Sequence, residues 1–216
     1  MTGPGSTLPA VDDTQLTTEP LSRSFYRRDP RAVAPELLNK VLVRGRRAGR
    51  IVEVEAYCGS IDPGSHAFRG RTNRNATMFG RPGLLYVYFT YGMHFCANAV
   101  CGEEGEGVAV LLRGLTPLRG LGQMRKLRPA ARRDADLCSG PAKLCAAFGL
   151  GRAFDGADLV TGDRGVVIGD DGTPPPAQPV VTTRIGLAAG RGDEHPWRWY
   201  VAGAAGVSRV RQLGLT

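Results

Sequence analysis

The stretch that decides the fold is residues 51–57, which read Ile-Val-Glu-Val-Glu-Ala-Tyr. From position 52 onward, apolar residues occupy the even positions, whereas Glu53, Glu55 and Tyr57 occupy the odd ones. Successive side chains of a β-strand point to opposite faces, so the pattern predicts a strand with an apolar face and a face of two carboxylates and a phenol. Carboxylates are rare in apolar surroundings, which indicates that the polar face serves a function.

A segment rich in aromatic, arginine and amide side chains follows, from Gly64 to Val100. Residues 84–90 and 93–100 are strand-like runs, and Tyr91-Gly92 between them is a plausible two-residue turn, so we expect a β-hairpin. Because this segment follows the polar strand closely, we interpret the two together as a pocket. Such a pocket would hold a flat ring and perform water chemistry beside it.

The remaining pattern mixes helices and strands with neither an internal repeat nor a regular alternation. Residues 28–40, 118–128 and 141–148 predict helices, the last of them bounded by Pro141 and Gly149. Residues 41–46 and 108–114 predict strands, and a tight turn is expected at 47–49. Clustered strands favour an α+β fold. We therefore predict a disordered tail over residues 1–19 and a single mixed domain over 20–216, with a curved, mainly antiparallel sheet flanked by helices and a protruding β-hairpin.

Length and charge bound the class of protein. The chain has 216 residues, 42% of them hydrophobic, which suits the core of one domain. A formal net charge of +8 favours an anionic partner, and nucleic acid is the leading candidate. A merely soluble basic protein is the alternative at this point.

Cysteine and histidine usage predicts neither a metal site nor a cofactor. Five cysteines form no CxxC pair, and only three histidines are present, so we expect reduced thiols in a cytoplasmic protein. The first residues lack the basic and apolar regions of a signal peptide, and no apolar run of about 18 residues occurs. We therefore expect no membrane partner.

The glutamates of the polar strand are the candidates for acid–base chemistry. Glu55, at the end of the strand, can act as a general base toward water, and Glu53 lies two residues earlier on the same face. The alternative is that either carboxylate pairs with an arginine. Arg113 ends an apolar strand and needs an anionic partner, which could be Glu55 or a substrate phosphate.

Aromatic and basic side chains are the candidates for binding a nucleic acid. Rings that face a cavity can stack on a base, and a ring at a hairpin tip can enter a duplex. The aromatic set comprises Tyr57, His66, Tyr86, Tyr88 and Tyr91. The basic and amide set comprises Arg69, Arg71, Arg74, Asn75, Arg81, Asn98 and Arg113, for which a solvated basic loop is the alternative.

Four long motifs resemble one known family. They are GRIVEVEAY (49–57), SHAFRGRTNRNATMFGRPGLLYVYFTYGMHFCANAV (65–100), AVLLRGLTPLRG (109–120) and SGPAKLCAAFGL (139–150). From about Leu21 to about Arg211, the chain is similar to the alkyladenine (3-methyladenine) DNA glycosylases. The resemblance implies a bacterial, nucleoid-associated repair enzyme, which we expect to be a monomer. It would flip alkylated or deaminated purines, such as 3-methyladenine, hypoxanthine and ethenoadenine, out of double-stranded DNA and hydrolyse the N-glycosidic bond.

The same resemblance implies catalytic roles for three residues. Glu55 matches the general base that activates water, and Arg113 matches the residue that helps hold this water and a nearby phosphate. The backbone of Ile185 matches the segment that also contacts the water. No lysine stands at the Glu55, Tyr57 or Arg113 positions to form a Schiff base, so we expect no strand-cleaving lyase step.

The resemblance also implies how DNA is bound. Tyr57, His66 and Tyr88 match the rings that enclose the flipped base. Tyr91 matches the residue that fills the vacated place in the base stack, and Asn98 matches the one that rejects guanine. Extracting a base costs a few kcal/mol, less for a damaged base, and such a wedge and pocket would offset that cost.

Three departures from the family pattern and two other functions remain open. Asn39 and Asn73 replace an expected glycine and proline, and residues 203–206 replace the usual turn. One alternative is a non-catalytic damage-binding or DNA-bending protein. The other is an RNA-directed or carbohydrate hydrolase that uses Glu53 and Glu55 as its carboxylate pair.

Overall fold

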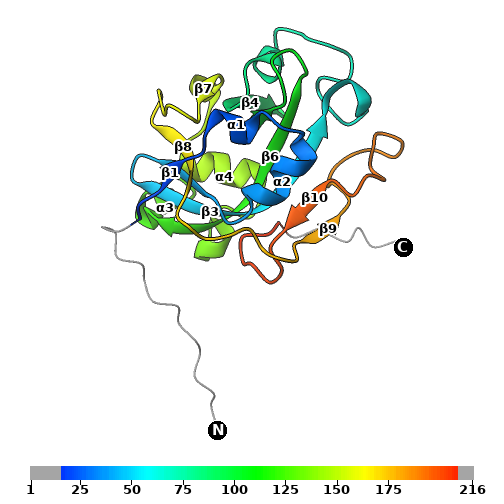
Figure 1. Ribbon diagram of the computed structural model, residues 1–216. Helices are drawn as coiled ribbons and strands as arrows, with labels where there is room; N and C mark the ends of the chain where they lie inside the picture. Colours follow the sequence, from blue (N-terminus) through cyan, green and yellow to red (C-terminus); the bar gives the residue numbers. More distant parts are fainter. Residues whose placement is uncertain (1–15, 209–216) are drawn as a thin grey trace, which may run out of the picture.

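A single antiparallel sheet dominates the computed structural model, which describes residues 16–208. Its strands are β1 (Glu19–Pro20), β2 (Val41–Arg44), β3 (Arg47–Cys58), β4 (Leu84–Thr90), β5 (His94–Cys101), β6 (Val108–Arg119), β7 (Ala157–Asp158), β8 (Val166–Asp170), β9 (Val180–Thr182) and β10 (Arg198–Tyr200). The order is β1-β8-β2-β3-β6-β5-β4-β7, and β10 pairs with β3 and β9 (Figure 1).

Four short α-helices accompany the sheet in the described residues: α1 (Arg23–Tyr26), α2 (Pro30–Leu37), α3 (Leu121–Leu127) and α4 (Pro141–Phe148). The predicted α4 is confirmed at both ends, because Pro141 occupies its first turn and Gly149 ends it in the left-handed region, with φ of 67°. Among the described residues, no helix has the length and apolar character needed to cross a membrane. The α+β class is confirmed.

The two longest strands, β3 and β6, form the centre of the sheet. One edge of β3 pairs with β6, while its other edge pairs first with β2 and then with β10. Alternate residues of both strands, such as Val54 and Leu112, belong to the main core together with residues of α2 and α4. Figure 1 shows these two helices beside the sheet. The sequence pattern of residues 51–57 therefore predicted this apolar face correctly, and the opposite face is free to carry polar side chains.

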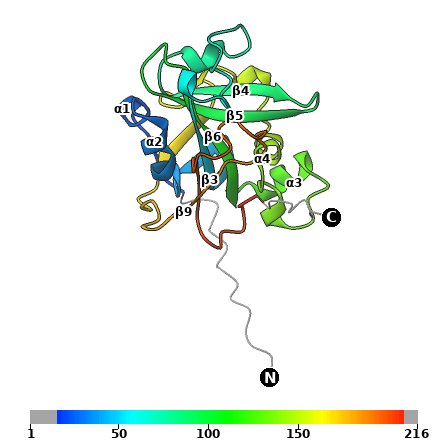
Figure 2. The same cartoon turned by 90° about the vertical axis from the view of Figure 1, so that its right-hand side faces the viewer.

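The predicted hairpin is formed by β4 and β5, and it projects from the body of the molecule (Figure 2). Its loop has three residues rather than the expected two, because Thr90 pairs with His94. Tyr91 and Gly92 both have positive φ, of 49° and 67°, and the Met93 N–H closes the loop by donating to the Thr90 carbonyl. The loop thus holds Tyr91 at the tip of the hairpin.

Three predicted boundaries were wrong for local backbone reasons. The helix expected over 28–40 ends at Leu37, because Asn39 takes a φ of 67° and donates its N–H to the Ile51 carbonyl. The turn expected at 47–49 lies earlier, at Gly45, whose φ is 54°. The helix expected from 118 begins at Leu121, since β6 continues to Arg119 and left-handed Gly120 separates the two.

The predicted tail falls mostly outside the described residues, which begin at 16. Its last residue, Glu19, already pairs with Asp170 of β8, so regular structure starts one residue before the predicted domain boundary. The stretch 209–216 also lies outside the described residues.

Leu112→Ala tests the central position of β6. Leu112 is fully buried in the main core, so a truncation should lower the free energy of unfolding by about 2–5 kcal/mol. Leu127→Ala is the matched control, because Leu127 is 49% exposed and should lose less than about 1 kcal/mol. Urea unfolding measures both values, and equal losses would contradict this packing.

Candidate active site

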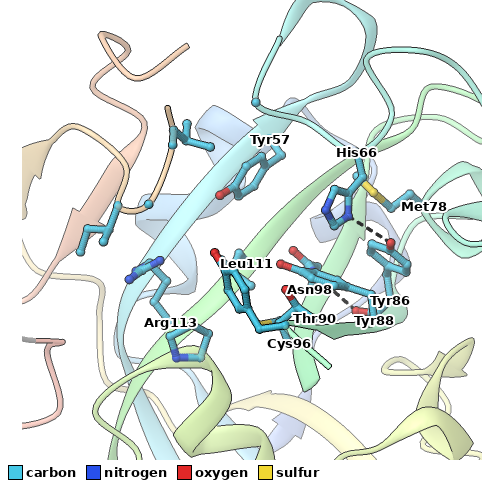
Figure 3. Close-up of a pocket in the computed structure, with 16 residues that line it drawn as sticks. Tyr57, His66, Met78, Tyr86, Tyr88, Thr90, Cys96, Asn98, Leu111 and Arg113 are labelled. Atoms are coloured by element: carbon cyan, nitrogen blue, oxygen red, sulfur yellow. Dashed lines mark hydrogen bonds between the residues drawn. The ribbon is translucent and has the colours of Figure 1, made fainter. Parts of the chain in front are cut away.

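The polar faces of four adjacent strands form a pocket of about 230 Å³. The register pairs Tyr86 with Asn98, Tyr88 with Cys96, and Leu111 with both Asn98 and Glu55, so these side chains share one face of the sheet. Ligand pockets often span about 300–1,000 Å³, so this one suits a single ring system. Its lining also includes Tyr57, His66, Met78, Thr90, Tyr91, Arg113, Pro141, Ile185 and Leu187 (Figure 3).

Glu55 lies directly behind the pocket surface and is fully buried. Its Oε1 accepts the Ile185 N–H at 2.7 Å, and its Oε2 accepts the Tyr57 hydroxyl at 3.0 Å. Arg113 Nη1 lies 3.2 Å from the same Oε2. Burial raises the pKa of Glu55, and its three partners, all of which line the pocket, offset this only in part. The carboxylate is therefore more basic than usual.

Glu53 has a contrasting environment on the same strand. Its Oε1 accepts Arg113 Nε at 3.0 Å and Arg198 Nε at 2.7 Å, and its Oε2 accepts the Ser208 N–H at 2.6 Å. Burial alone would raise its pKa, but Arg113, Ser208 and Arg198 outweigh burial and bring the pKa below its ordinary value. The two glutamates thus differ in basicity, as in sites where neighbouring carboxylates have separate roles.

This arrangement argues against the hydrolase that would use Glu53 and Glu55 as a pair. Glu53 is held by two arginines and a serine, and it does not line the pocket. Neither glutamate is itself part of the pocket lining, but Glu55 contacts three residues that are, Tyr57, Arg113 and Ile185, whereas Glu53 reaches the lining only through Arg113. The alternative that a carboxylate pairs with an arginine is found for both glutamates, with two arginines on Glu53 and one on Glu55.

Rings and an amide surround the end of the pocket away from Arg113 (Figure 3). His66 Nδ1 lies 3.2 Å from the Tyr86 hydroxyl, and its ring packs edge-on against Tyr88 with centroids 4.5 Å apart. The Asn98 amide nitrogen donates to the Tyr86 carbonyl at 3.2 Å, which fixes the amide in the wall. Partial burial of the ring, and then Arg74, lowers the pKa of His66, which favours the neutral imidazole.

Tyr91 stands at the mouth of the pocket and is 83% exposed at the hairpin tip. A large ring exposed to this degree buries little area in the protein, so the core does not explain its position. The structure therefore brings all eight predicted site residues to one place: Glu55, Tyr57, His66, Tyr88, Tyr91, Asn98, Arg113 and Ile185.

The loop of residues 69–75, predicted to be basic and exposed, has exposed arginines but a buried asparagine. Arg69, Arg71 and Arg74 are exposed. Asn75 is buried instead, where its side chain accepts from Thr72 and donates to the His66 and Gly70 carbonyls. Asn75 thus organises the loop, and within that set it is a structural residue rather than an exposed one.

The ion pair between Arg184 and Asp62 is a part of the site that the sequence pattern did not predict. Both side chains are fully buried, and two hydrogen bonds of 2.6 and 2.7 Å join them. The guanidinium lies between the rings of Tyr57 and Trp197, 4.7 and 5.1 Å from their centroids. Since Arg184 precedes Ile185, this ion pair anchors both the Tyr57 wall and the N–H that Glu55 accepts. An isolated Asp in GSIDPG offers no signal of such a role.

Five other residues that line the pocket were not predicted from the sequence, because their residue types are common in cores and turns. Met78, Cys96, Leu111, Pro141 and Leu187 belong to patterns that suit any core or turn. All five cysteines of the chain are free and buried. Within residues 16–208, no group of three or more His, Cys, Asp or Glu side chains is arranged to hold a metal ion.

Asp62→Asn tests the anchoring role of the buried ion pair. It leaves the Arg184 charge buried without its counter-ion, so the free energy of unfolding should fall by about 3–5 kcal/mol. Asp134→Asn is the control, because its pair with Arg125 is exposed and should be worth less than about 1 kcal/mol. Similar losses in both variants, measured by urea unfolding, would show that the buried pair has no special role.

Comparison with known proteins identifies the family of the chain. The family model described as methylpurine-DNA glycosylase matches residues 24–205. A Burkholderia lata protein named "Putative 3-methyladenine DNA glycosylase" is 56% identical over 87% of this chain and 90% of its own length. Proteins of the same name from Streptomyces avermitilis and Methanocella arvoryzae are 48% and 44% identical, over 89% and 88% of this chain and 92% and 96% of their own. The chain therefore belongs to the methylpurine-DNA glycosylase family, and it is a DNA-repair hydrolase that acts on DNA.

Proposed function

We propose that this glycosylase removes alkylated or deaminated purines, of the 3-methyladenine, hypoxanthine and ethenoadenine kinds, from double-stranded DNA. The observation that carries the proposal is the buried, basic Glu55 directly behind a small pocket of aromatic rings. The family membership supplies the reaction class, and the pocket supports the choice of a flat purine. We further propose that the protein works as a monomer in the bacterial cytoplasm.

The base would be held by the rings of the pocket. Tyr57, His66 and Tyr88 offer faces and edges to a flat ring, and stacking is worth about 1–3 kcal/mol per base. Electron-rich tyrosine faces also favour the positive charge of an alkylated purine. Asn98, fixed in the wall by the Tyr86 carbonyl, would reject normal guanine by crowding its exocyclic amino group.

Glu55 would act as the general base toward a water that attacks C1′ of the sugar. Burial raises the pKa of Glu55, and a more basic carboxylate takes a proton from water more readily. For the water to reach Oε2, the Tyr57 hydroxyl would give up its hydrogen bond. Arg113, which adjoins Oε2, and the backbone around Ile185 would then hold the water in line, while the Ile185 N–H keeps Oε1 in place.

We propose a monofunctional reaction, without a step that cleaves the DNA strand. Among the described residues, those that line the pocket include no lysine. Without an amine to form a Schiff base, the proposed enzyme releases the base and leaves the DNA strand intact.

The hairpin tip would maintain the extruded state. Tyr91 is exposed beside the pocket mouth, where its ring can occupy the space that the flipped nucleotide leaves in the stack. The net charge of +8 and the exposed arginines of residues 69–74 would attract the phosphates.

Glu55→Gln should lower the single-turnover rate of base release by about 100-fold or more, because Gln cannot accept the proton of water. The duplexes carry hypoxanthine, ethenoadenine or 3-methyladenine, and lesion binding is measured in parallel. Glu104→Gln, at an exposed position, is the control and should keep the wild-type rate. Unchanged release by the Glu55 variant would remove it from the chemistry. Lesion binding without release by the wild type would leave the non-catalytic alternative.

Tyr91→Ala should slow base release from duplex DNA by about tenfold or more, since an extruded nucleotide costs a few kcal/mol that the ring no longer offsets. Binding of a free damaged base should change little. The control is Leu127→Ala, which truncates an exposed apolar side chain of α3 that does not line the pocket. Equal losses for the duplex and for the free base would refute the wedge role.

A further inference from the structure

A single guanidinium, that of Arg113, lies between the two buried carboxylates of β3. Arg113 occupies an irregular position of the β3–β6 ladder, where the register shifts and its neighbours Leu112 and Gly114 pair instead. A residue that lies outside a regular pairing can direct its side chain differently from its neighbours. Its nitrogens divide between partners, with Nε on Glu53, Nη1 near Glu55 and Nη2 on Ser208.

The guanidinium is aligned on Glu53 rather than on Glu55. The Nε–H donates to Glu53 at 3.0 Å with hydrogen-bond geometry, and Nη2 donates to Ser208 Oγ at 3.3 Å. Toward Glu55 there is a single ion-pair contact of 3.2 Å. A bidentate arginine is the strongest stabiliser of an ionised carboxylate, so an arginine turned fully to Glu55 would make Glu55 a weaker base.

Glu53 itself is strongly held. Arg198 of β10 donates to it at 2.7 Å, and the Ser208 hydroxyl lies 2.7 and 2.6 Å from its two oxygens. Both oxygens of Glu53 are occupied by Arg113, Arg198 and Ser208, and of these only Arg113 lines the pocket, so we assign Glu53 no direct role in water activation. Glu53 can still influence the reaction through Arg113, because the Arg113 guanidinium contacts both Glu53 and Glu55.

We propose that Glu53 is a positioning residue for the reaction, which holds Arg113 away from a bidentate contact with Glu55 and so preserves Glu55 as a base. The proposal rests on the proposed function of Glu55. Removal of Glu53 has two effects of the same sign: a like charge disappears, and Arg113 is free to turn to Glu55. Both favour the ionised form of Glu55 and lower its pKa.

The groups that face Glu55 come from every neighbouring element. They are Glu53 and Tyr57 of β3, Arg113 of β6, Cys96 of β5, Tyr88 of β4, and Arg184 with the Ile185 N–H of the segment before β10. Of the acidic groups in this set, only Glu53 is held below its ordinary pKa while Glu55, Tyr57, Tyr88 and Cys96 are raised. Glu53 is thus the nearby negative charge throughout the titration of Glu55.

The test is a direct titration of the Glu55 carboxyl by carbon NMR in the free, full-length protein. In Glu53→Gln the midpoint of Glu55 should fall by about one pH unit. Glu104→Gln is the control: it removes an exposed carboxylate that contacts neither Glu55 nor Arg113, so the midpoint should stay. An unmoved or raised midpoint in Glu53→Gln, or an equal fall in Glu104→Gln, would overturn the proposal.

Arg198→Gln keeps the proposal testable if Glu53→Gln does not fold. Glu53 then loses one counter-ion while keeping its charge and Arg113, so the midpoint of Glu55 should rise. A fall, or no change, would contradict the proposed arrangement. In Arg198→Gln the Glu55 midpoint is therefore expected to move in the opposite direction from that in Glu53→Gln. A general loosening of the site would not produce shifts of opposite sign.

Base release as a function of pH separates this inference from the proposed function. In Glu53→Gln, the acid limb of the single-turnover rate should move down with the Glu55 midpoint, and the rate near pH 7 should fall about tenfold while lesion binding persists. An acid limb that stays while the Glu55 midpoint moves would overturn the positioning role. If the wild type releases no base, the proposed function is contradicted. The change in the Glu55 titration midpoint would still show whether Glu53 and Arg113 set the basicity of Glu55.

Discussion

Buried charge at the centre of the sheet is the constraint on which this structure depends. Glu53, Glu55 and Arg113 lie on the paired strands β3 and β6, where none of them is more than 6% exposed. Burying an ion costs several kcal/mol unless partners replace its water. Here each partner comes from a different part of the chain: Arg198 from β10, Ser208 from the segment after it and Ile185 from the segment before it. The need to satisfy these charges therefore ties residues 184–208 to the sheet.

The site combines rigid strands with segments that they anchor. Strands β3 to β6 fix the positions of the pocket wall through hydrogen-bonded register, which limits displacement of Tyr88, Asn98 and Glu55. The anchored segments supply what the sheet cannot, namely the Ile185 N–H and the exposed ring of Tyr91. The buried pair of Arg184 and Asp62 joins both parts, because it contacts the Tyr57 ring and precedes Ile185.

The parts of the fold that depend on short local sequence patterns were predicted correctly. The alternation in residues 51–57 predicted the apolar face of β3. Pro141 and Gly149, at the two ends of α4, predicted that helix. The errors fall where single residues take left-handed conformations, at Asn39 and Gly120, or where a strand continues beyond its apolar run. Such boundaries depend on pairing with distant strands, which a local pattern does not contain.

The sequence by itself determined the chemistry available to this protein: two carboxylates on one strand face, a cluster of rings, an arginine at the end of an apolar strand and motifs of one glycosylase family. Only the tertiary structure decided which of these groups lies beside the pocket and which is held by counter-ions away from it. The two glutamates are nearly equivalent in sequence, yet Arg198 and Ser208 fold onto Glu53 and leave Glu55 beside the pocket. The reason is physical, since basicity depends on burial and on charges a few ångströms away, and those neighbours lie about 60 to 155 residues distant along the chain.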